Sequence, residues 1–209
     1  MVARALHLVR HGEVHNPAGV IYGRLPEFRL SDRGERMAAR TAESLADLPI
    51  TRIVASPLLR TQQSAQPIAE IFGLPVESDE RVIESGNALE GRVSAGTALF
   101  RDPRDWRLFV NPLRPSWGEP YTEIVERMRR AIFDVFASTD DGDVVIVTHQ
   151  LPIWMVHRSM AGEPLPHDPR HRRCALSSVT SVARRDGRLA EIAYTDPAAG
   201  VAAVDQGAS

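Results

Sequence analysis

Three short apolar runs in the chain each end in a polar or charged residue. They cover residues 6–9, 50–55 and 143–148. Runs of this length suit buried strands and are too short for helices. The third run is apolar between its two ends, which is typical of a strand in a parallel sheet covered on both faces. A weaker fourth strand is expected around Val76.

Four longer stretches instead repeat apolar residues at the spacing of an amphipathic helix. They are residues 31–48, 57–72, 123–136 and 151–161. Ser31 is the expected cap of the first helix. Pro57 and Pro152 suit the first turns of the second and fourth helices. Gly73 and Gly162 are expected to end those two helices.

The last part of the chain predicts a β-hairpin, with strands at 178–183 and 189–194 around a favoured Asp-Gly turn. Residues 197–209 are rich in Ala, Gly and Ser, and we expect them to be a disordered tail. The order of the elements predicts one α/β domain over residues 1–196. Its fold class is a three-layer α/β/α sandwich around a mostly parallel sheet.

Residues 92–121 differ from the rest because they contain four prolines, with Trp106, Phe109 and Trp117 between them. We expect an irregular insertion that lies over the C-terminal edge of the sheet as a lid and sets substrate choice. An equally open alternative is a small hydrophobic cluster that only closes the core.

Composition excludes several classes of protein. The formal net charge is −2, so no global basic field favours nucleic acid or an anionic membrane, and all 25 basic residues are arginines. Cys174 is the single cysteine, which rules out an intrachain disulfide and a cysteine metal cluster. No apolar run is long enough to cross a bilayer. The N-terminus lacks a signal-peptide core, so we expect a cytoplasmic protein.

The polar residues at the strand ends suggest phosphate chemistry. His11 follows the first strand between Arg10 and Gly12, His149 follows the third, and Arg60 lies in the first turn of the helix after the second. Because parallel strands end at one edge of a sheet, these side chains should meet there. Arginine forks hold phosphate bidentately, and a neutral imidazole can attack phosphorus.

The string Leu-Val-Arg-His-Gly-Glu, with Asn16 five residues after His11, resembles the signature of the histidine phosphatase superfamily, the phosphoglycerate mutase-like family. The resemblance extends from Leu6 to about Gly162. It implies a phosphoglycerate mutase-like fold and a phosphoryl group carried covalently on His11. The other histidines share no ligand spacing, and His7 is expected to have a local partner in its strand.

The family also places a carboxylic acid before a stretch that ends in Glu-Gly, and residues 81–91 have this form. This makes Glu84 the candidate general acid, with Glu13 and Glu90 as competitors. His149 is assigned to stabilising the phosphoryl oxygens, as a cation or at least as a donor. Gly12 is expected to let the loop approach the phosphate closely.

The expected catalytic residues are therefore His11, Glu84, His149, Arg10 and Arg60. The expected substrate-binding residues are Arg10, Asn16, Gly23, Arg60, His149 and Gln150. Many family members have glycine where Gln150 stands, so its side chain either narrows the pocket or supplies an amide donor. No metal or cofactor is expected, because the arginines and His149 supply the positive charge that Mg²⁺ gives elsewhere.

These features favour a metal-independent phosphatase that acts on a small phosphorylated metabolite. Two alternatives stay open, a phosphoglycerate mutase and a phospho-ligand-binding protein without turnover. The sequence does not specify the phosphate ester, and a homodimer is among the assembly states that it allows.

Overall fold

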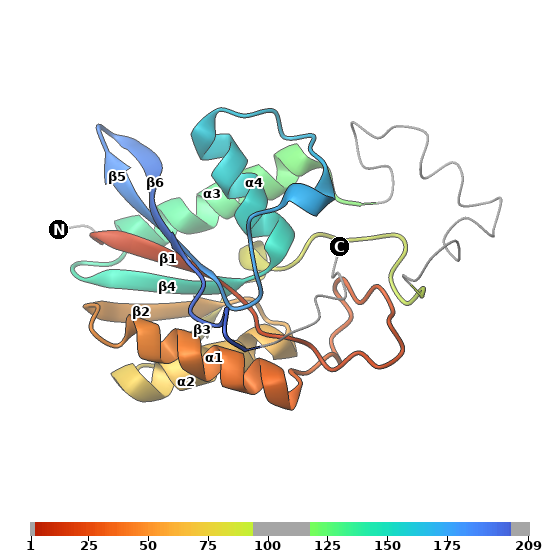
Figure 1. Cartoon of the computed structure of the whole chain (residues 1–209). Coiled ribbons are helices and arrows are strands. Elements are labelled where there is room, and N and C mark those ends of the chain that lie inside the picture. Colours follow the sequence, from red (N-terminus) through yellow and green to blue (C-terminus); the bar gives the residue numbers. More distant parts are fainter. Residues whose placement is uncertain (1–2, 94–117, 202–209) are drawn as a thin grey trace.

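The computed structural model describes residues 3–93 and 118–201 (Figure 1). Most of the expected insertion, with Trp106, Phe109 and Trp117, lies outside the described residues. The strands are β1 (Ala5–Arg10), β2 (Ile50–Ala55), β3 (Val76–Ser78), β4 (Asp143–Thr148), β5 (Val179–Arg185) and β6 (Arg188–Thr195). The helices are α1 (Asp32–Leu45), α2 (Leu59–Phe72), α3 (Tyr121–Ala137) and α4 (Gln150–Ala161), with short 3₁₀ turns η1 (Glu80–Val82) and η4 (Pro169–His171).

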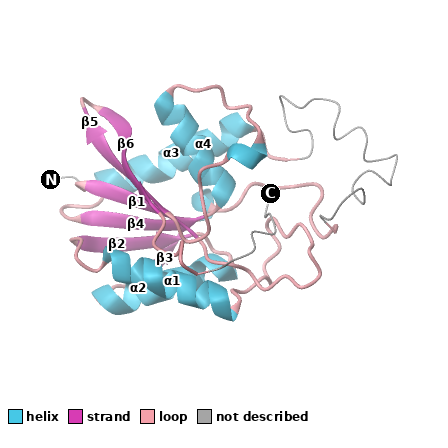
Figure 2. Ribbon diagram, in the orientation of Figure 1, coloured by secondary structure: helices cyan, strands magenta, loops and turns pink. Residues whose placement is uncertain are grey.

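The strands form one six-stranded sheet in the order β3-β2-β4-β1-β5-β6. The pairs β2–β3, β2–β4 and β1–β4 are parallel, whereas the hairpin β5–β6 is antiparallel and extends the sheet beyond β1. Helices α1 and α2 cover one face and α3 and α4 the other (Figures 1 and 2). The predicted three-layer α/β/α sandwich with a mostly parallel sheet is confirmed.

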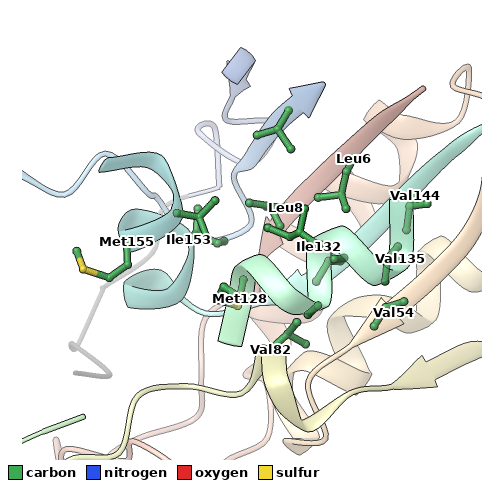
Figure 3. Packing of buried hydrophobic residues seen from close by; sticks show 14 of the residues in the cluster. Leu6, Leu8, Val54, Val82, Met128, Ile132, Val135, Val144, Ile153 and Met155 are labelled. Atoms are coloured by element: carbon green, nitrogen blue, oxygen red, sulfur yellow. The ribbon is translucent and has the colours of Figure 1, made fainter. Parts of the chain in front are cut away.

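Alternation along the central strands supplies both halves of the core. Leu6 and Leu8 of β1 pack with α3 and α4, together with residues such as Met128 and Ile132 (Figure 3). Val9, the residue after Leu8, belongs instead to the cluster formed with α1 and α2. The central strands β1 and β4 are thus each buried on both faces, which explains their apolar sequences.

Several expected local signals are found in place. The Ser31 hydroxyl accepts a hydrogen bond from the Gly34 amide and caps α1. Gly73 and Gly162 follow α2 and α4 in the left-handed conformation, with φ of 64° and 69°. The expectation for Pro57 was wrong, because Leu58 is extended and the helix begins only at Leu59.

The packed chain continues beyond residue 196. Ala198 is buried against Met37 of α1 and against Leu176, and Val201 packs on the same cluster. Residues 197–201, which were expected to begin the tail, are therefore part of the packed domain. Residues 202–209 lie outside the described part.

The conformation after β1 depends on a close approach between two glycines. A Cβ on Gly12 would lie 2.5 Å from the Gly34 carbonyl oxygen, and a Cβ on Gly34 would lie 2.0 Å from the Glu13 carbonyl oxygen. Gly12 is therefore needed where the loop packs on α1. The expectation that it also lets the loop approach a phosphate closely stays a prediction.

This contact predicts the effect of Gly34→Ala. Helix propensity alone would favour alanine by about 1 kcal/mol. The overlap with backbone atoms should outweigh that gain and lower the free energy of unfolding by roughly 1–3 kcal/mol. Urea denaturation measures the difference, with Glu35→Ala on the exposed side of the same helix as the control. A more stable Gly34→Ala variant would contradict the packing described here.

Candidate active site

Neighbouring parallel strands place the two expected histidines side by side. Arg10 of β1 is in register with Thr148 of β4, so His11 and His149 follow at the same edge of the sheet. Their ring centroids lie 5.2 Å apart in an edge-on arrangement. Both side chains are fully buried.

A backbone contact sets the tautomer of His11. Its Nδ1 lies 2.8 Å from the Gly12 carbonyl oxygen, and a carbonyl can only accept a hydrogen bond. Nδ1 therefore carries the proton, and the lone pair is on Nε2. This is the ring nitrogen that a nucleophilic histidine would use.

His149 is held by a serine to which the sequence analysis assigned no role. The Oγ of Ser56, which follows β2, lies 2.9 Å from Nε2 of His149. Burial, followed by the nearby charge of Arg60, holds the pKa of His149 well below its usual value. This lowered pKa favours the neutral ring, and thus the donor form, of the two forms expected for His149.

The two expected arginines are also fully buried. Arg10 donates from Nη1 to the Cys174 carbonyl at 2.6 Å, and Arg60 donates from Nη2 to the Gly23 carbonyl at 2.5 Å. The Arg60 guanidinium also lies over the Tyr22 ring, 4.9 Å from its centroid. These hydrogen bonds to backbone carbonyls orient the two guanidinium forks, the group that binds phosphate oxygens bidentately.

Glu84, the first of the three candidate acids, lies beside His149. It is fully buried, its Oε1 accepts from the Ser85 amide at 2.8 Å, and its Oε2 lies 3.9 Å from Nδ1 of His149. Burial raises its pKa, against the opposing charges of Arg60 and Arg172. Together with the lowered pKa of His149, this raised pKa favours the neutral forms of both groups.

The competing glutamates serve the scaffold. Glu13 accepts from the Ser31 hydroxyl at 2.7 Å and from Arg33 at 3.3 Å, which ties it to the start of α1. Glu90 accepts through Oε1 from the backbone amides of Arg24 and Asn87. The geometry therefore favours Glu84 as the acid.

The other expected substrate-binding residues are Asn16, Gly23 and Gln150, and each takes part in a hydrogen bond that involves the backbone. Asn16 uses both polar atoms of its side chain on the backbone of Val20, at 2.9 and 3.1 Å. Gly23 has a φ of 35° and presents its carbonyl to Arg60. Gln150 begins α4, where its amide lies 3.4 Å from the Cys174 carbonyl that Arg10 also contacts.

Sequence reasoning missed Arg172. This arginine donates to His167 at 2.9 Å and to Gln150 at 3.3 Å, and its charge acts on Glu84. Burial lowers its pKa, partly offset by Tyr121 and Glu84. A signal that could have indicated it is the basic run at residues 170–173. It adds a third arginine to the surroundings of the acid.

Both ends of the undescribed segment are attached beside the acid. Val93 forms an antiparallel bridge with Val20, and Gly118 forms one with Asn87. Glu119 then accepts from Arg24 and from Arg127, and Arg24 also donates to the Glu84 carbonyl at 2.7 Å. The role expected of residues 92–121 in substrate choice stays a prediction.

No group of three or more His, Cys, Asp or Glu side chains in residues 3–93 and 118–201 is arranged to hold a metal ion. His7 has the expected local partners, the Ser181 hydroxyl at 2.8 Å and the Asp143 carboxylate at 3.2 Å. Among the described helices none is both long and apolar enough to span a bilayer.

Comparison with known proteins decides the family. The model of the histidine phosphatase superfamily (branch 1) matches residues 6–197. The chain belongs to this superfamily. It is 49% identical over 195 residues to the Mycobacterium tuberculosis protein Rv0525, covering 93% of this chain and 96% of that one.

The relatives whose names state an activity include both mutases and phosphatases. A probable phosphoglycerate mutase GpmB from Erwinia tasmaniensis is 31% identical, with 83% of each chain covered. Phosphoserine phosphatase 1 from Hydrogenobacter thermophilus is 30% identical, with 77% of each covered. The solved mycobacterial glucosyl-3-phosphoglycerate phosphatase Rv2419c has the same fold, with a TM-score of 0.76 at 23% identity over 90% of this chain and 97% of that one.

The raised pKa of Glu84 predicts a pH dependence of stability. As pH rises above the pKa of an unfolded glutamate, the unfolded chain releases this proton while the folded chain keeps it. Wild type should therefore lose stability relative to Glu84→Gln as pH rises from about 4 towards the raised pKa, and the difference should then stay constant.

Urea denaturation of both proteins between pH 4 and 8 measures this difference. Glu43→Gln, an exposed change on α1, is the matched control and should give a flat difference. A flat difference for Glu84→Gln as well would show that the carboxyl group is not held protonated by burial.

Proposed function

We propose that this protein is a metal-independent phosphatase that hydrolyses a small phosphomonoester in the cytoplasm through a phosphohistidine on His11. The observation that carries the proposal is the orientation of His11 by the Gly12 carbonyl, next to His149 and to a buried Glu84 whose pKa is raised. His11 supplies the lone pair that attacks phosphorus, and Glu84 supplies the proton for the leaving group. Superfamily membership and the 30% identity to a phosphoserine phosphatase support the same reaction class.

In the first step, the Nε2 lone pair of His11 attacks phosphorus, and the bond between phosphorus and the ester oxygen breaks. The proton of Glu84 passes to the leaving oxygen, so the alcohol departs neutral. Arg10 and Arg60 neutralise the phosphoryl oxygens, and neutral His149 donates a hydrogen bond to them. Their charge and geometry do not depend on a metal ion.

In the second step, the Glu84 carboxylate takes a proton from water as the water oxygen attacks phosphorus. The bond between phosphorus and Nε2 breaks, inorganic phosphate forms, and His11 regains its lone pair. Glu84 ends protonated, ready for the next turnover. A carboxyl group whose pKa is raised by burial serves both directions of proton transfer near neutral pH.

Mutase activity is the second candidate, and the relationship to the probable phosphoglycerate mutase favours it. A mutase must keep the phosphoryl group on the enzyme and exclude water, and it needs cations for a second anionic group. Arg172 is such a cation. Release of phosphate from p-nitrophenyl phosphate and from 3-phosphoglycerate, measured with and without EDTA, separates the phosphatase, the mutase and a protein without turnover.

The first kinetic prediction concerns His11→Ala. It should lower kcat with p-nitrophenyl phosphate by at least about a thousandfold, because no other group supplies the nucleophile. Wild type quenched during turnover should carry an acid-labile, base-stable phosphate that the variant lacks. Circular dichroism and urea denaturation check that the variant is folded. Full activity in His11→Ala would exclude the mechanism.

The second kinetic prediction concerns the leaving group. General acid catalysis contributes about 10²–10⁴-fold where the leaving oxygen needs a proton. Glu84→Gln should therefore slow hydrolysis of an alkyl phosphate far more than that of p-nitrophenyl phosphate. Glu90→Gln is the matched control and should show no such selectivity. Equal losses on both substrates in Glu84→Gln would assign the proton to another donor.

A further inference from the structure

A cavity of about 570 Å³ lies between α3, α4 and the β5–β6 turn, away from the histidines. Strand register gives its position. Val179 pairs with Val9, next to the catalytic edge, whereas Ala183 pairs with Ala5 at the start of β1. The turn after β5 is therefore at the opposite edge of the sheet, roughly 20 Å from His11 along β1.

Apolar side chains form about half of the wall of this cavity. They include Phe133 and Phe136 of α3, Val156 and Met160 of α4, and Leu189 of β6. Phe136 and Val156 belong to the main core, but Phe133 is 59% exposed. A large aromatic side chain in water beside a cavity is a feature of interaction sites.

Three arginines complete the lining: Arg129 of α3, Arg184 of β5 and Arg188 of β6. In the described part of the chain none of them forms an ion pair. Other arginines nearby do form ion pairs, Arg130 with Glu126 and Arg173 with Glu191. The cavity thus combines apolar walls with positive charge that no carboxylate offsets.

We propose that this cavity binds a small amphiphilic anion, with an aromatic or aliphatic body and one carboxylate, sulfonate or phosphate group. The body would pack on Phe133 and Met160, and the anionic group would bind the arginine forks. Small-molecule sites commonly have volumes of about 300–1,000 Å³, apolar walls and a few convergent polar groups. The site is distinct from the catalytic centre, and it does not depend on the proposed reaction.

A second copy of this chain suits the cavity less well. A two-fold dimer places the same patch on both sides of the interface. Arg129, Arg184 and Arg188 would then face their own copies, which costs electrostatic free energy. An anionic occupant has the opposite charge and fits the observed lining.

Titration with 8-anilino-1-naphthalenesulfonate, followed by its fluorescence, tests the proposal on the full chain. Replacing both Arg184 and Arg188 by Gln should weaken dye binding at least about tenfold, a loss expected when charge-assisted hydrogen bonds are removed. Phe133→Ser should weaken it too. The matched control is Arg185→Gln, an exposed neighbour outside the lining, which should change the affinity less than about twofold.

A second arm separates this cavity from the catalytic site. Orthovanadate, which resembles a phosphoryl group, should leave dye binding unchanged, and His11→Ala should bind the dye as wild type does. Circular dichroism confirms that each variant is folded, and Arg129→Gln gives an independent variant of the same rim.

Three results would overturn the proposal. Orthovanadate that displaces the dye would place the dye at the histidines. An equal loss in Arg185→Gln would assign binding to general surface charge. Binding to anionic phosphatidylglycerol vesicles through Arg184 and Arg188, without binding of the free dye, would make this face a membrane contact instead.

Discussion

Arg10 in β1 lies opposite Thr148 in β4, and each strand is followed by a histidine. This register, between two strands buried on both faces, fixes the relative position of the two histidines. A shift of one residue would turn every side chain of a strand to the other face and would bury polar atoms in an apolar core. The separation of His11 from His149 is therefore set by the packing of the whole sheet, and not by the loops that follow it.

Burial of positive charge is the main electrostatic constraint of the site. Arg10 and Arg60 have no exposed surface, and the bonds that orient them go to backbone carbonyls of Cys174 and Gly23. A carbonyl accepts a hydrogen bond from a guanidinium without bringing a formal negative charge into the site. The same positive field favours the neutral form of His149 and opposes the protonated form of Glu84, yet burial outweighs it at Glu84.

The sequence could predict the parts that depend on local pattern. Strand runs, the Ser31 cap, the Gly73 and Gly162 helix ends and the Asp-Gly hairpin all follow from periodicity or from backbone preference, and the structure has them. Placing residues at the ends of parallel strands also brought His11 and His149 together correctly.

Contacts between distant segments could not be predicted in the same way. Ser56 reaches His149 across 93 positions, and Arg172 joins Gln150 from a connection without regular structure. The requirement for Gly12 comes from Gly34, which no local rule relates to it. Periodicity carries no information on such pairs, because they depend on how the finished layers pack.

The position of Glu84 shows how such contacts act on the chemistry. The acid lies after a short 3₁₀ turn, where no helix or strand fixes the backbone. The hydroxyl of Thr148 instead holds the Val82 carbonyl at 2.5 Å, and Arg24 holds the carbonyl of Glu84 itself at 2.7 Å. One bond comes from the end of β4 and the other from the loop that also supplies Gly23. The proposed proton donor is therefore positioned by the two segments that already position His149 and Arg60, so the proposed acid and the proposed phosphate-binding groups share one frame.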